Sequence, residues 1–184
     1  MIKTFTTEAI VLRRVNYSDS DRILTLITPS GGKISAMARG VRKLKSKKAG
    51  HLDLGCVVKV FLARGRKINV LTQATTIYGN ENIKIDLTLS KYLFESLEIV
   101  DKLTVEGQDL DFVYEDLLSF IKALKNTQSP REELFHFYRS LLINVGFWTT
   151  NVESRLPLLP EQRLNYLRSV AEFVISTPIK SRFI

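Results

Sequence analysis

The sequence predicts an α+β protein in which a five-stranded β-barrel comes first and a helical domain follows. Two patterns support this prediction. The apolar side chains of residues 1–79 follow the period of two that is typical of strands, and those of residues 80–184 follow the longer period of helices. With 184 residues, 45% of them hydrophobic, the chain can bury a core without disulfides. We therefore expect one domain over residues 1–79 and a second over residues 80–184.

Five short segments have the pattern of β-strands. Residues 22–28 and 33–39 each alternate between two faces, and Pro29-Ser30-Gly31-Gly32 between them is a suitable hairpin turn. The other three strands are expected over residues 9–12, 57–62 and 68–74. Five strands in so short a stretch favour a closed barrel, because closure leaves no exposed sheet edge.

Four helices are expected in the second half, because apolar residues there form stripes at helical spacing. The third helix has the clearest limits. Ser129 is a suitable N-cap before Pro130, Glu132 is placed to complete a capping box, and Gly146 is a natural stop. The expected helices occupy residues 89–103, 113–124, 130–145 and 160–174.

Charge is distributed unevenly along the chain. The formal net charge is +8, but residues 1–79 hold 15 Lys and Arg against 4 Asp and Glu, whereas residues 80–184 hold 12 against 15. This asymmetry predicts that the first domain binds a polyanion and that the second domain has another role. The alternative interpretation is a basic protein with no special partner.

The densest run of basic residues is the segment 39–48, which we call the basic loop and which adjoins the third expected strand. Six of its ten residues are Lys or Arg, and cations this close repel one another unless they face anions such as backbone phosphates. Tyr17 and Phe61 are candidate platforms for stacked bases, although a Phe in an apolar strand is more often a core residue. The candidate phosphate-binding residues are Arg13, Arg14, Arg22, Arg39, Arg42, Lys43, Lys45, Lys47, Lys48, Arg64 and Arg66.

The residues that catalysis or metal binding would need do not cluster in the sequence. Cys56 is the single cysteine, so the chain has no internal disulfide and no cysteine set for zinc. His51 and His136 lie in different halves, and Asp19 and Asp21 have no third acidic residue nearby. No phosphate-binding loop motif, signal peptide or membrane span is recognisable. We therefore expect a cytoplasmic protein that is not an enzyme and needs no metal or cofactor.

The first 75 residues contain an ordered series of short motifs. These are TEAIVL at 7–12, Tyr17 with DRILTL at 21–26, GKI at 32–34, GVRK at 40–43 with Ser46, and LTQA at 71–74. The series resembles the N-terminal part of the bacterial RecO family of recombination mediators and DNA repair proteins. Beyond it the similarity is loose and is best over residues 137–147, where a helix ends in Gly followed by an aromatic residue.

The resemblance implies an oligonucleotide/oligosaccharide-binding (OB) barrel followed by a helical domain. It also implies binding of single- and double-stranded DNA, annealing of complementary strands, and partnership with RecR and single-strand-binding protein in loading RecA, in the cytoplasm at the bacterial nucleoid. Many relatives carry a four-cysteine zinc module after the Gly-aromatic element, but residues 149–159 contain no cysteine, so no zinc is expected.

Two alternatives remain open at this stage. Phosphate contacts do not distinguish DNA from RNA, so an RNA-binding barrel of ribosome assembly or translation fits the same residues. A basic adaptor that binds an acidic protein tail is the other alternative. A nuclease would need clustered carboxylates, which the sequence does not offer.

Overall fold

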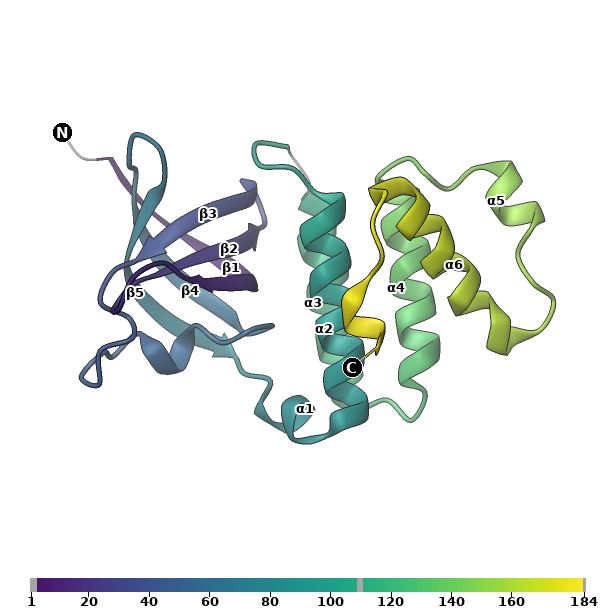
Figure 1. Cartoon of the computed structure of the whole chain (residues 1–184), viewed down its shortest axis with the longest axis horizontal. Helices are drawn as coiled ribbons and strands as arrows, with labels where there is room; N and C mark the ends of the chain where they lie inside the picture. Colours follow the sequence, from purple (N-terminus) through teal and green to yellow (C-terminus); the bar gives the residue numbers. More distant parts are fainter. Residues whose placement is uncertain (1–2, 109–110, 184) are drawn as a thin grey trace. The chain divides into compact units, whose positions relative to one another are not determined.

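The structure is a computed structural model that describes residues 3–108 and 111–183 (Figure 1). The described residues divide into two compact units. The barrel unit comprises Met1–Asn80 with Thr104–Tyr114, and the helical unit comprises Glu81–Leu103 with Glu115–Ile184. The α+β class is confirmed, and the domain boundary after residue 79 stays a prediction. Sequence patterns did not indicate that residues 104–114 belong with the barrel.

All of the expected strands and helices are present. The strands are β1 (Thr4–Asn16), β2 (Arg22–Thr28), β3 (Gly32–Ala38), β4 (Val57–Ala63) and β5 (Asn69–Tyr78). The helices are α1 (Glu81–Ile85), α2 (Leu87–Leu103), α3 (Asp111–Leu124), α4 (Pro130–Asn144), α5 (Thr150–Ser154) and α6 (Pro160–Ile175). Short 3₁₀ turns lie at Ala49–His51 and Lys180–Phe183. Strand β1 is longer than expected at both ends, and α1 and α5 are not among the predicted elements.

The five strands close into a barrel in the order β1-β2-β3-β5-β4, and β4 pairs again with β1. Every pairing is antiparallel except that of β3 with β5, which is parallel and joins Ala36 to Asn69 and Met37 to Val70. A small five-stranded barrel with this order is an OB-fold, as the resemblance implied.

The barrel core is formed by the inward side chains of alternate strand positions, as the period of two predicts. A bulge between Val11 and Arg13 shifts the register of β1 against β2, and beyond it residues 13–16 are exposed. The buried core residues are Ala9, Val11, Leu24, Leu26, Ala36, Ala38, Val41, Leu52, Cys56, Val58, Val60, Leu62 and Leu71.

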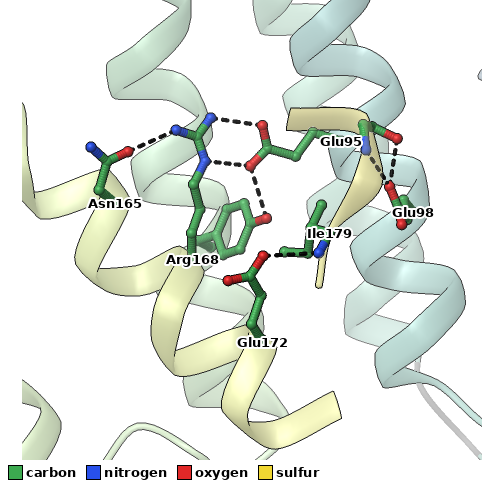
Figure 2. A network of polar contacts seen from close by, with 8 residues as sticks. Glu95, Glu98, Asn165, Arg168, Glu172 and Ile179 are labelled. Carbon is green, nitrogen blue, oxygen red and sulfur yellow. Dashed lines mark hydrogen bonds and ion pairs between the residues drawn. The ribbon is translucent and has the colours of Figure 1, made fainter. Parts of the chain in front are cut away.

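Within the helical unit, α2, α4 and α6 pack together around a buried ion pair. Glu95 of α2 is fully buried, and its carboxylate accepts hydrogen bonds of 2.6 and 2.7 Å from the Arg168 guanidinium (Figure 2). The Tyr138 hydroxyl donates to the same carboxylate at 3.0 Å. Burial, reinforced by the negative charge of Glu95, raises the pKa of Tyr138, so its hydroxyl stays protonated as a donor.

The segment after α6 is tied back to α2 and α6 by two more carboxylates (Figure 2). Glu98 accepts from the backbone N–H groups of Lys180 and Ser181, at 3.0 and 2.7 Å, and Glu172 accepts from the N–H of Ile179 at 2.9 Å. Burial alone would raise the pKa of Glu98, but its hydrogen bonds, above all from Lys102, outweigh burial and lower the pKa to about 2. The carboxylate is therefore ionised at neutral pH, and the tie is intact.

The two ends of α4 confirm the predicted glycine stop and contradict the predicted capping box. Gly146 has a φ of 80°, and the N–H of Phe147 donates to the carbonyl of Leu142 at 2.8 Å, which is a Schellman-type ending. The capping box is wrong. The Ser129 side chain makes no capping hydrogen bond. The backbone N–H of Ser129 donates to the Thr127 hydroxyl at 3.0 Å, so this N–H is not available to the Glu132 carboxylate.

Replacing Glu95 by Ala should destabilise the chain by about 3–5 kcal/mol, because Arg168 would keep a nearly buried charge without its partner. Urea unfolding monitored by circular dichroism measures this free energy. Glu153→Ala is the matched control, since Glu153 faces Arg139 at 3.9 Å on the surface and its loss should cost less than about 1 kcal/mol. Equal losses for the two variants would contradict the structural role assigned to Glu95.

Candidate nucleic-acid interface

The basic loop is anchored at its start by one buried side chain and by hydrogen bonds to the turn between β1 and β2. Val41 is fully buried in the barrel core. The Asp21 carboxylate accepts from the N–H of Gly40 at 2.8 Å, and the Arg42 guanidinium donates to the carbonyl of Ser18 at 2.8 Å. Gly40 has a φ of 65°, a conformation that glycine adopts without strain. The loop is therefore presented from a fixed base.

The surroundings of Asp21 favour the ionised form of its carboxyl group. The hydrogen bond from the N–H of Gly40, helped by the Ser20 hydroxyl and the charge of Arg39, lowers the pKa of Asp21. The tie between the turn and the loop therefore persists at neutral pH and weakens only when acid protonates the carboxylate. Asp21 thus has a structural role, since it joins the β1–β2 turn to the basic loop.

A cleft of about 600 Å³ lies between the basic loop and β5. Lys43, Lys45 and Lys47 are exposed at its rim, and no acidic residue is among the described residues that line it. The Ser46 hydroxyl is buried and has no hydrogen-bond partner within the described part of the chain. The other lining residues are Gly40, Lys48, His51, Thr72, Gln73, Ala74 and Thr75. Such a cleft offers phosphate oxygens several cations without a competing carboxylate.

Two of the lining residues make hydrogen bonds to the backbone of the loop or of β5. The Lys48 ammonium donates to the carbonyls of Arg39 and Leu71, at 3.1 and 3.4 Å. The N–H of Thr76 donates to Nδ1 of His51 at 3.3 Å, which fixes the imidazole beside β5. Lys48 therefore closes the loop on itself as well as adding charge to it.

The remaining candidate arginines lie outside the loop. Arg14 forms a 2.6 Å ion pair with Asp53, and Arg22 donates to the Asn16 side chain at 3.1 Å. The N–H of Arg64 donates to the carbonyl of Lys3, just before β1 begins, whereas Arg22 pairs with Asn16 at the other end of β1. A strand of 13 residues is about 40 Å long when extended. Arg64 and its neighbour Arg66 therefore lie at the opposite end of β1 from Arg22.

Both aromatic candidates are on the surface of the barrel. Tyr17 is 65% exposed in the β1–β2 turn, and Phe61 is 36% exposed on β4. The interpretation of Phe61 as a core residue is wrong, because Val58, Val60 and Leu62 occupy the inward positions of β4. Lys59 shares the outward face with Phe61 and was not among the candidates, although the alternation of β4 already indicates its direction.

No group of three or more His, Cys, Asp or Glu side chains suited to a metal ion occurs among the residues that the structure describes. The Cys56 thiol is buried and lies 3.4 Å from the Asn80 side-chain oxygen, to which it donates. Within the described ranges, the helices are all too short or too polar to span a membrane.

Comparison with known proteins agrees with the barrel. Residues 1–80 match the family described as "Recombination protein O N terminal". A "DNA repair protein RecO" of Dehalococcoides mccartyi (strain CBDB1) is 38% identical over 143 residues, which are 78% of this chain and 56% of the relative. The chain belongs to the RecO family.

Two further RecO relatives are less similar in sequence. The "DNA repair protein RecO" of Roseiflexus sp. (strain RS-1) is 34% identical over 66% of this chain and 43% of its own length. That of Syntrophomonas wolfei is 28% identical over 76% of this chain and 56% of its own length. The chain thus spans about half the length of these RecO proteins.

Replacing Asp21 by Ala should loosen the basic loop, because Gly40 loses the acceptor of its N–H. The expected result is faster hydrogen exchange at the Gly40 amide and its neighbours, with little change in the barrel strands. Asp19→Ala, in the same turn, is the control and should leave this exchange unchanged. Unaltered exchange at Gly40 in the Asp21 variant would show that Val41 and the hydrogen bonds of Arg42 hold the loop without Asp21.

Proposed function

We propose that this chain binds single- and double-stranded DNA through the basic loop and anneals complementary strands during DNA repair. The observation that carries the proposal is the cleft beside β5, where exposed lysines surround a hollow that is free of acidic residues among those described. Phosphates spaced along a strand suit this arrangement, because each bound phosphate releases condensed counter-ions. Membership in a family whose relatives are named DNA repair proteins supports the same role.

Annealing in this proposal needs no covalent chemistry and no cofactor. Two complementary strands repel each other through their phosphates, and a cationic surface lowers this barrier by neutralising charge and raising their local concentration. Base pairing then provides the specificity. The protein acts as a mediator in place of an enzyme.

The proposed partners follow from the same family role. We propose RecR and single-strand-binding protein as direct partners, with RecA loaded indirectly, in the cytoplasm at the nucleoid. The basic loop supplies the DNA contact, and Lys43, Lys45 and Lys47 contribute most because their exposed side chains line the cleft. Arg42 and Lys48 contribute less, since each also donates to backbone carbonyls.

Replacing Lys43, Lys45 and Lys47 together by Ala should flatten the salt dependence of single-strand binding. A plot of the logarithm of the binding constant against the logarithm of the salt concentration has a slope of about −0.7 per neutralised phosphate, so three lost contacts should flatten the slope by about 2. Fluorescence anisotropy over a range of salt concentrations measures the slope. Annealing of labelled complementary strands, with and without single-strand-binding protein, should slow in parallel.

The control removes three cations elsewhere. Lys122, Lys125 and Arg155 lie on the surface of the helical unit, and their joint replacement by Ala changes the net charge equally. This control should keep the wild-type slope and annealing rate, and both triple variants should keep their thermal midpoints. A loop variant that folds, binds and anneals as the wild type does would refute the proposed interface.

Competition between DNA and RNA oligonucleotides of matched sequence tests the choice of polymer. The proposed function predicts that DNA competes at least as well as RNA for the intact chain, since phosphate contacts and base stacking occur with both polymers. A strong preference for RNA would favour the alternative of an RNA-binding barrel, because the 2′-hydroxyl is the group that distinguishes RNA.

A further inference from the structure

The face that OB-folds commonly use is partly occupied in this barrel. OB-folds bind oligonucleotides over their second and third strands and the adjoining loops. Here the segment that returns to the barrel unit bridges to the start of β3, where Glu106 pairs with Gly32 and Lys33. The Lys33 ammonium donates to the carbonyl of Thr104 at 3.0 Å, and the Ser35 hydroxyl donates to the Glu106 carboxylate. This carboxylate would repel phosphates from β3.

The outer face of β4 and β5 has a more suitable composition. Lys59 stands opposite Thr75 of β5, and Phe61 stands opposite Gln73. Paired positions share one face of a sheet, and the neighbouring β4 residues point into the core, so these four side chains share the outer face. The face thus combines an exposed aromatic ring with a cation and neutral polar groups.

Two hollows join along this face. The hollow beside Phe61 has a volume of about 210 Å³ and is lined also by Lys59, Gln73 and Thr75. Gln73 and Thr75 line the cleft beneath the basic loop as well. The two hollows therefore adjoin at Gln73 and Thr75, and together they outline a track from the basic loop to Phe61. Glu8 of β1 stands opposite Lys59 and bounds the track on that side, since its carboxylate repels phosphates.

We propose that a single strand of DNA lies along this track, with phosphates at the basic loop and one base stacked on Phe61. The inference rests on the proposed function and adds the path of the strand. Beyond Phe61 the track leads to the end of β4 and the β4–β5 hairpin, where Arg64 and Arg66 are exposed. The basic loop and the hairpin arginines thus meet one strand at its two ends.

Two properties of the ligand follow from this path. The ten residues of β5 span about 30 Å, which matches at most about nine nucleotides of a stacked strand. Stacking on Phe61 requires a base that is not already stacked in a duplex, so single strands use the whole track and duplexes use only the cationic loop.

The test is the Phe61→Ala variant of the full chain, with short poly-dT and a duplex of equal length as probes. Affinity for poly-dT should fall about 5- to 100-fold, the usual effect of losing one stacked base. The salt slope should not change, because Phe61 carries no charge. Affinity for the duplex should stay within about twofold.

Two further variants separate the loss of stacking from a loss of folding. Phe61→Trp in a Trp148→Phe background should keep wild-type affinity, and its fluorescence should be quenched when poly-dT binds. Tyr17→Ala, which removes the other aromatic candidate for base stacking, should bind as the wild type does.

Three results would overturn the path. If Phe61→Ala binds poly-dT normally while the triple lysine variant binds weakly, the track is wrong and the proposed function stands. If Tyr17→Ala loses affinity and Phe61→Ala does not, the strand leaves the loop over the β1–β2 turn. If the wild-type chain binds no DNA, the track and the proposed function both fail.

Discussion

Closure of a small barrel is the constraint on which the rest of the basic half depends. Five strands enclose a core of apolar side chains, so the inside has no room for any of the 15 cations of residues 1–79. They must lie on outward strand positions or in the connections. The connection between β3 and β4 takes six of them in ten residues, and only firm anchors keep such a loop in one conformation against its own repulsion.

The two units differ in how their charged side chains are neutralised. In the helical unit, Glu95 and Arg168 neutralise each other in a buried pair that also holds Tyr138, and nothing external is needed. In the basic loop, the anchors are Val41, the Asp21 carboxylate and backbone carbonyls, and these leave most of the positive charge of the loop uncompensated. An external polyanion is the natural complement of the basic loop, whereas the buried Glu95 of the helical unit already has its counter-ion in Arg168.

The apolar periodicity of the sequence predicted the strands and helices, but it did not predict which distant segments pair with one another. Alternation in β2, β3 and β4 predicted the core, because inward positions of a barrel must be apolar. The parallel pairing of β3 with β5 and the return of Glu106 to β3 connect distant segments, and no local pattern encodes them. Glu95 lies on the buried side of α2 because Arg168, far along the chain, compensates it. The position of Phe61 could not be predicted from the apolar composition of β4, because even an apolar strand has an outer face.

The outer face of β4 and β5 also bears on how a bound strand can pair with another. A base stacked on an aromatic ring uses its flat face, so its hydrogen-bonding edge stays open to a complementary base. Lysines that neutralise the phosphates of the first strand also weaken its repulsion of a second. On the proposed path, a surface that combines Phe61 with the basic loop would bind any sequence, because stacking and phosphate contacts read no base edge. Recognition of the complementary sequence is then left to base pairing, as annealing requires.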